Sequence, residues 1–240
     1  AVRQATLTLR RQGLLASHAE FLPTLEEAFR EATAAAPELA DPFFHMGRMK
    51  RALLRPDEAL ALQDQALQRV PDFAPSRYER AILLAPRYGA RIEELRNRWR
   101  RQEGRRLEEA GELDKAGMGG QAVRALPPDS ELAEADPEAR DLRLRLLADL
   151  ADLRRGAERA GTALSASRLD CAEGLQVYHT GGDRSEARRL LERARAAEPT
   201  LEEAYEGLAR IAFDDNDLPG ALAAYTRGFE ADRGYLPHLF

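Results

Sequence analysis

The chain has 240 residues, of which 44% are hydrophobic and 32% charged, and its formal net charge is −5. This composition excludes a disordered or membrane-embedded chain, because no run approaches the roughly 18 consecutive apolar residues of a transmembrane helix. The negative charge disfavours a general nucleic-acid binder, and no signal peptide is recognisable, so we expect a cytoplasmic protein. The single cysteine, Cys171, leaves neither an intramolecular disulfide nor a cysteine-based zinc site.

The first elements of the chain follow a pattern of large and small residues whose period is 34, the separation of Pro37 and Pro71. The first unit reads Leu9-x2-Gln12-Gly13, then Leu25-x3-Phe29-x2-Ala32 and Pro37. The second unit reads Phe43-x2-Met46-Gly47, then Ala59-x3-Gln63-x2-Ala66 and Pro71. Each unit predicts two helices, the second of which ends at the proline. Thr24 and Glu27 have capping-box spacing, so a helix is expected to start at Thr24.

The middle of the chain departs from this pattern. A third unit begins after Pro71, with Tyr78 on its first helix, but its second helix carries Glu93, Asn97 and Arg100 where small and aromatic residues are expected. Residues 91–106 are predicted to form one long basic helix, followed by a glycine-rich turn at residues 117–120.

A helical stretch with a clear apolar face follows this turn. Pro127-Pro128-Asp129 predicts a break, and Asp136 is expected to cap a helix that begins with Pro137. That helix runs to about Arg155 and places four leucines on one face, namely Leu142, Leu146, Leu150 and Leu153. The region between residues 89 and 165 is therefore either a set of degenerate repeats or a helical insertion. We favour stacked degenerate repeats, because each short array alone would leave a hydrophobic end exposed.

The repeat pattern returns near the C-terminus. One unit has Cys171, Leu175 and Tyr178, then Ala187-x3-Leu191-x2-Ala194 and Pro199. The next has Tyr205-x2-Leu208-Ala209, then Ala221-x3-Tyr225-x2-Gly228. Asp183 and Thr200 are each followed by glutamate three residues later, which predicts helix starts at both positions.

These units resemble the tetratricopeptide repeat family, whose 34-residue helix–turn–helix unit has this order of large, small and terminating residues. The resemblance implies an all-α fold, a right-handed superhelical solenoid of antiparallel helix pairs. We expect tetratricopeptide-like repeats in residues 1–88, an irregular helical segment or degenerate repeats in 89–165, and further repeats in 166–240.

The resemblance also implies where a partner would bind. In this family the first helix of each unit lines a concave surface that receives peptides or partner helices. Arg48 and Arg51 beside Phe44 would suit an acidic segment with an apolar anchor, whereas Leu14 replaces an asparagine that some family members use to hold a C-terminal carboxylate. The predicted partner-binding residues are Arg10, Phe44, Arg48, Arg51, Tyr78, Gln176, His179 and Arg210.

Charge is separated along the sequence. Residues 77–106 contain ten arginines and four glutamates, whereas residues 198–232 contain nine acidic residues and two arginines. These regions are either solvated helix faces or surfaces for an acidic partner, including the acidic end of a second copy. Nucleic acid is a weaker alternative, because one tryptophan offers little surface for base stacking.

No residue pattern indicates catalysis, cofactor binding or metal binding. The glycines at 117–120 are not followed by the lysine of a phosphate-binding loop. The carboxylate pairs Glu202-Glu203 and Asp214-Asp215 lie at helix starts or loops, where solvated charge is expected. We therefore expect no enzyme activity and no cofactor in this chain.

Three functional hypotheses follow. The leading one is a scaffold that binds a protein or peptide in the concave groove of the repeat array. A second is a regulatory or substrate-recruiting module within a larger signalling enzyme, because the array resembles the repeat regions of some large bacterial serine/threonine protein kinases. The start at Ala1 and the end at Phe240 fit such a larger parent. A third is nucleic-acid binding through the basic helix at Arg91–Arg106.

Overall fold

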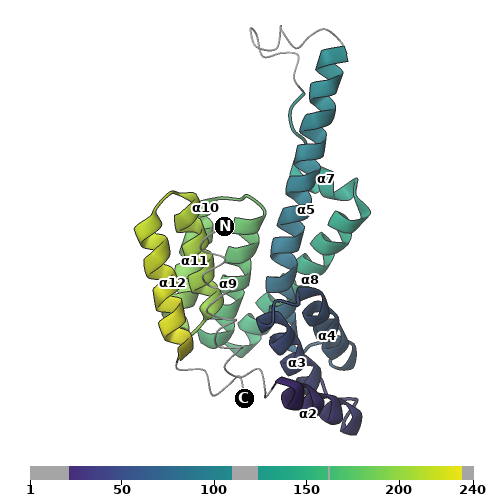
Figure 1. Ribbon diagram of the computed structural model, residues 1–240, viewed down its shortest axis with the longest axis vertical. Helices are drawn as coiled ribbons and strands as arrows, with labels where there is room; N and C mark the ends of the chain where they lie inside the picture. Colours follow the sequence, from purple (N-terminus) through teal and green to yellow (C-terminus); the bar gives the residue numbers. More distant parts are fainter. Residues whose placement is uncertain (1–21, 110–123, 162, 234–240) are drawn as a thin grey trace.

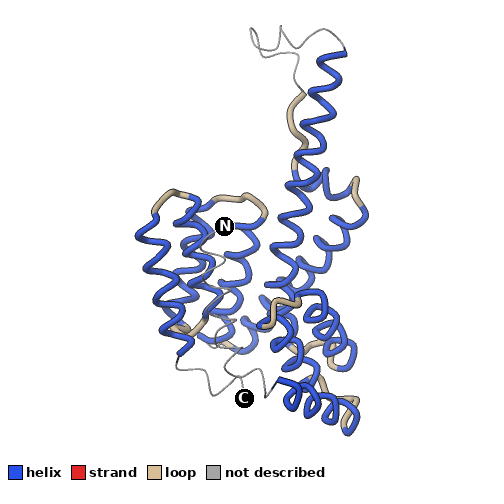
Figure 2. Tube along the Cα trace, in the orientation of Figure 1, coloured by secondary structure: helices blue, strands red, loops and turns tan. Residues whose placement is uncertain are grey.

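The structure of the chain is a computed structural model that describes residues 22–109, 124–161 and 163–233. Within these ranges the regular secondary structure consists of ten α-helices and no strand, which confirms the predicted all-α class (Figures 1 and 2). The first helix of the first unit, expected around Leu9 and Gly13, lies outside the described residues. The helices are α2 (Leu22–Ala35), α3 (Asp41–Ala52), α4 (Pro56–Arg69), α5 (Ala74–Glu109), α7 (Asp129–Glu134), α8 (Pro137–Ala160), α9 (Ala163–His179), α10 (Arg184–Ala197), α11 (Glu202–Asp214) and α12 (Leu218–Arg233).

Three helix pairs form where the repeat pattern predicts them: α3 with α4, α9 with α10, and α11 with α12. Glycines in the first or second helix of each pair allow the close approach. A Cβ on Gly47 would lie 2.3 Å from Gln63 Nε2, and one on Gly174 would lie 2.9 Å from Leu191 Cγ. Small residues therefore stand at the helix contacts, as the pattern predicts, because a larger side chain would force the helices apart.

The third unit is built differently, because its first helix does not end where a turn is expected. Helix α5 continues through Pro86 and across the predicted division between residues 88 and 89. Leu84, Tyr88 and Ile92 are all buried, so the apolar face continues on both sides of the proline. Burial of this face outweighs the single backbone hydrogen bond that the proline removes. The expectation of a separate second helix within residues 89–109 is wrong.

Helix α8 takes the place of that second helix. It packs against both α5 and α9, and the four predicted face residues Leu142, Leu146, Leu150 and Leu153 are buried. The predicted cap is confirmed, because the Asp136 carboxylate accepts a hydrogen bond of 2.9 Å from Ala139 N. Helices α5 and α8 thus form a pair that contacts α4 on one side and α9 on the other.

The C-terminal part of α5 extends past the other described helices (Figure 1). We call residues 97–109 the projecting end of α5. The returning chain is held against it by Glu103, whose carboxylate accepts a hydrogen bond of 2.9 Å from Arg124 N and pairs with Arg106. These two bonds hold the pKa of Glu103 at about 2. Helix α7 then begins at Asp129, at the predicted break, whereas the predicted turn at residues 117–120 lies outside the described residues.

The helix starts agree with the sequence at some positions and not at others. Asp183 caps α10 by accepting a hydrogen bond of 2.8 Å from Ser185 N, as predicted. Thr24, in contrast, is the third residue of α2, and the N-cap of α11 is Leu201 rather than Thr200. Leu201 is part of the apolar core, so its burial fixes where α11 starts. The prediction of capping boxes at Thr24 and Thr200 is wrong.

One apolar core joins the pairs. It contains side chains from α4, α5, α7, α8, α9, α10 and α11. A smaller cluster of Ala40, Phe43 and Ala66 lies under α3 and α4. Within the described residues the first helices of the units contact one another, α5 with α9 and α9 with α11, and α5 also contacts α3.

Candidate partner-binding surface

Four first helices contribute side chains to a buried group of polar residues. We call this group the inner polar cluster: Arg51 of α3, Tyr78 and Glu79 of α5, Cys171 of α9, and Glu203 of α11. Each of these helices is the first helix of its pair, so the cluster lies on the face where the family resemblance places the concave surface.

Arg51 is the centre of the cluster. Its Nη2 atom lies 2.6 Å from Glu203 Oε1, and its Nε atom lies 2.9 Å from Glu79 Oε2. The Nε–Oε2 contact is an ion pair without a hydrogen bond, whereas Arg51 Nη2 donates a long hydrogen bond of 3.4 Å to Glu79 Oε1. One guanidinium thus holds two carboxylates from helices that are distant in sequence.

Burial and charge have opposing effects on the two carboxylates. Burial raises the pKa of Glu79 more than the Arg51 guanidinium lowers it, and the neighbouring Glu203 adds to the rise. Burial also raises the pKa of Glu203, but Arg51 and Arg48 outweigh it, and the net shift is downward.

Tyr78 and Cys171 complete the cluster. The Tyr78 hydroxyl lies 3.5 Å from Cys171 Sγ and 3.4 Å from Glu203 Oε2. Burial raises the pKa of both the Tyr78 phenol and the Cys171 thiol. A buried thiol with a raised pKa is not a nucleophile, so Cys171 has a packing role.

Phe44 and Arg48 form the accessible rim of this cluster. Both lie on α3, and the Arg48 guanidinium carbon is 5.9 Å from the centre of the Phe44 ring. Arg48 Nε is 3.4 Å from Glu79 Oε1, and about half of the Arg48 side chain is exposed. The Phe44 ring meets His45 edge-on at 4.9 Å and Phe73 at 5.6 Å between ring centres. The rim therefore combines an accessible cation with a group of aromatic rings.

The other predicted residues lie apart from the rim. Gln176, His179 and Arg210 are near the C-terminal ends of α9 and α11, and His179 is eight residues, or about 12 Å of helix, beyond Cys171. Arg210 pairs with Glu206 at 2.7 Å. Burial and the positive charge of Arg210 lower the pKa of His179 to about 4. Arg10 lies outside the described residues.

The structure thus brings together four of the eight predicted residues. Phe44, Arg48, Arg51 and Tyr78 are neighbours; Tyr78 is buried, and Arg51, whose side chain is 21% exposed, is held by internal carboxylates. Sequence reasoning missed Glu79 and Glu203. Glu203 was expected to be solvated because it follows a helix start, yet only 12% of its side chain is exposed. The position of Glu203, two residues before the repeat residue Tyr205, does not indicate a contact with α3.

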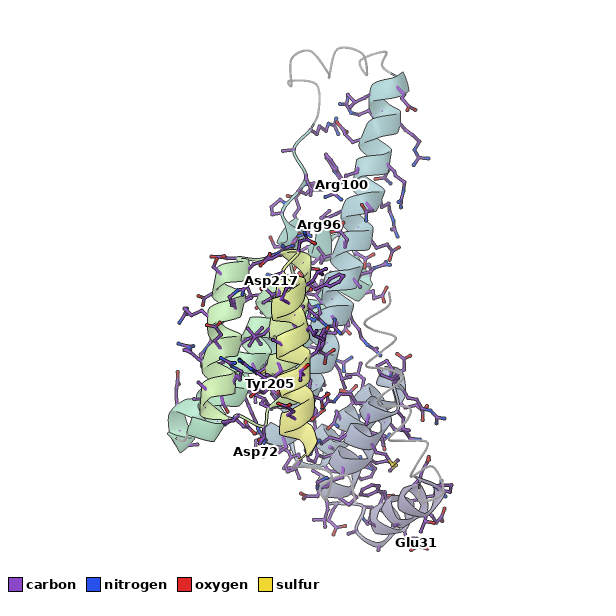
Figure 3. All side chains as sticks on the ribbon, turned by 60° about the vertical axis from the view of Figure 1, so that its left-hand side comes forward. Glu31, Asp72, Arg96, Arg100, Tyr205 and Asp217 are labelled. Atoms are coloured by element: carbon purple, nitrogen blue, oxygen red, sulfur yellow. The ribbon has the colours of Figure 1, made fainter. Side chains whose placement is uncertain are left out.

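The charge separation seen in the sequence is largely neutralised by the fold. Eight of the ten arginines between residues 77 and 106 have a carboxylate partner, and Arg101 and Arg105 are the two without one in the part of the chain described. Among the acidic residues, Glu198 pairs with Arg168 and Asp215 with Arg188. Figure 3 shows Arg96 and Arg100 on the upper part of α5. Little of the predicted basic surface is left for nucleic acid.

Two further searches bear on function. No described helix combines the length and the apolar composition that a membrane span requires. Within residues 22–109, 124–161 and 163–233, no group of three or more acidic, histidine or cysteine side chains is placed to hold a metal ion.

The comparisons with known proteins are negative. No protein-family model matches the chain, and no curated protein matches it. The geometry of the inner polar cluster and its rim is therefore the basis for a functional proposal.

Proposed function

We propose that the chain is a protein-binding helical repeat array of the tetratricopeptide kind, which takes an acidic segment with an apolar side chain at the rim formed by Phe44 and Arg48. The observation that carries this proposal is the exposed Arg48 guanidinium beside a group of aromatic rings on the first-helix face. A cation next to aromatic surface suits a carboxylate followed by an apolar residue. The superhelical form of the array belongs to the same proposal and is supported by the four stacked helix pairs.

The proposal is tested with a fluorescein-labelled peptide of three glutamates and one phenylalanine, using fluorescence anisotropy. We expect saturable binding that weakens at least about tenfold in Arg48→Glu, because the variant places a negative charge where the peptide is acidic. Arg227→Glu is the matched control, since Arg227 is exposed on α12 and reversal there makes the same change in net charge. Equal affinity of both variants for the peptide would reject the rim as the binding site.

Phe44→Ala separates the apolar part of the surface from the charged part. We expect it to weaken the same peptide about threefold to tenfold and to leave a peptide of four glutamates almost unaffected. The regulatory and nucleic-acid hypotheses remain predictions, and neither gains an observation comparable to the Phe44 and Arg48 rim.

A further inference from the structure

One ion pair connects the two ends of the described array. Arg51 is at the C-terminal end of α3 and Glu203 is in the first turn of α11, and their side chains meet at 2.6 Å although they are 152 residues apart. Helices α3 and α11 do not pack along their lengths, in contrast to α3 with α4 or α10 with α11. The Arg51–Glu203 pair is therefore a side-chain contact across the first-helix face rather than a by-product of helix packing.

Arg51 does not need Glu203 to remain compensated. Glu79 also contacts its guanidinium, with Nε–Oε2 and Nη2–Oε1 separations of 2.9 and 3.4 Å. Arg48 adds a second cation at 3.4 Å from Glu79. If Glu203 moved away, Arg48 and Arg51 would face one internal carboxylate, that of Glu79. A carboxylate from another molecule could then bind Arg51 in the place that Glu203 occupies.

We propose that Glu203 is an internal ligand that a partner's carboxylate replaces on Arg51, and that this exchange separates α11 from α3. The inference rests on the proposed function and names its recognition step: a glutamate or aspartate of the partner enters beside Arg48 and takes the place of Glu203. The apolar residue of the partner then packs on Phe44, which adjoins Arg48 at the rim. The chain thus binds an acidic segment in competition with its own α11.

Two features support an exchange rather than a permanent bond. The Arg51–Glu79 contact lacks hydrogen-bond geometry on Nε, so the existing set of partners is imperfect. The exchange also conserves charge, because one carboxylate leaves the guanidinium as another arrives, and no unpaired buried charge is created.

The test uses Glu203→Gln in the full chain, with Glu192→Gln on the exposed face of α10 as the matched control for loss of one negative charge. Spin labels at Arg55→Cys and Thr226→Cys, both at exposed positions, report the separation of the N-terminal and C-terminal pairs. Cys171 is buried and stays unlabelled. We expect the distribution of distances between the two labels to broaden and shift to longer values in Glu203→Gln. We expect the same change in the labelled protein that keeps Glu203 when the peptide of three glutamates and one phenylalanine is saturating.

Affinity gives a second readout of the same exchange. We expect Glu203→Gln to bind that peptide about fivefold to tenfold more tightly, because the internal competitor is lost. If the peptide binds the original chain but Glu203→Gln changes neither the distance nor the affinity, the internal-ligand inference is overturned and the proposed function stands. If the distance broadens but no form of the protein binds the peptide, the proposed function and the exchange both fail.

If Glu203→Gln does not fold, a second variant can be used in its place. Glu203→Asp keeps the charge and withdraws the carboxylate by one methylene, so it should shift both readouts in the same direction by a smaller amount. The absence of any shift in a folded Glu203→Asp protein, together with unchanged peptide affinity, would also overturn the inference.

Discussion

The α9–α10 pair and the α5–α8 pair achieve the same packing by different means. Residues 180–183 connect α9 to α10, and Gly174 lets the two helices approach closely. Helices α5 and α8 are connected through the projecting end of α5 and α7, and their interface contains a buried charge, Asp149. The comparison shows that the pairing of helices depends on the side chains that face each other and only weakly on the length of the connection.

The clearest way to break the α5–α8 pair is to remove its buried carboxylate. Asp149 is fully buried on α8 and contacts Arg77 at 3.1 Å and Arg80 at 2.7 Å. We expect Asp149→Ala to lower the free energy of unfolding by about 3 kcal/mol, because two guanidiniums lose a buried partner. Urea unfolding measures the effect. Asp141→Ala on the same helix is the control and should cost less than about 0.5 kcal/mol, since Asp141 is mostly exposed.

The contact between α5 and α9 should depend on pH through His179. The pKa of His179 falls from 6.5 to about 4 on folding, through burial and the charge of Arg210. The folded protein therefore binds fewer protons than the unfolded chain, so stability is fully present above pH 6.5 and is lost as the pH falls towards 4. We expect the loss to be roughly 2 kcal/mol. His179→Asn should lack this loss, so the stability of the original protein relative to the variant should fall by that amount between pH 6.5 and 4 in urea unfolding. An NMR titration giving His179 a pKa near 6.5 would contradict this.

Two glycines allow a comparison of a tight helix contact with a helix surface that has no neighbouring atoms. In Gly174→Ala the new methyl carbon would lie 2.9 Å from Leu191 Cγ and 3.2 Å from Ala187 O, so we expect a loss of about 1–2 kcal/mol. In Gly104→Ala, on the projecting end of α5, the methyl group meets nothing within 4 Å, and the higher helix propensity of alanine should add about 0.5–1 kcal/mol. Thermal unfolding measures whether each variant is less or more stable than the original protein. A gain from Gly174→Ala would show that α9 and α10 pack less tightly than described.

The sequence predicts the three regular helix pairs because their packing depends on local spacing of large and small residues. Gly47, one period after Gly13, and Leu191, which lies between Ala187 and Ala194, belong to the 34-residue pattern, whereas Gly174 does not. The α5–α8 pair is not visible in this way, because continued burial across Pro86 joins two predicted helices and the partner helix comes much later in the chain. Recognising that pair requires knowing which faces meet in three dimensions.

The candidate site follows the same rule. Phe44 and Arg48 could be predicted as accessible first-helix residues, because both lie on a single helix with a known face. The ion pair of Arg51 and Glu203 could not, because it joins α3 to α11 and depends on how four pairs stack. Likewise, the basic character of residues 77–106 is cancelled by carboxylates from other helices, among them Asp64, Asp136 and Asp149.

The most direct test of the account is hydrogen exchange across the whole chain, with and without the peptide of three glutamates and one phenylalanine. The rim formed by Phe44 and Arg48 and the projecting end of α5 are two arginine-bearing regions between which this measurement distinguishes. We expect the peptide to slow exchange in α3 around Phe44 and Arg48 and to leave the projecting end, with Arg101 and Arg105, unchanged. Protection of the projecting end without protection of α3 would contradict binding at the rim formed by Phe44 and Arg48.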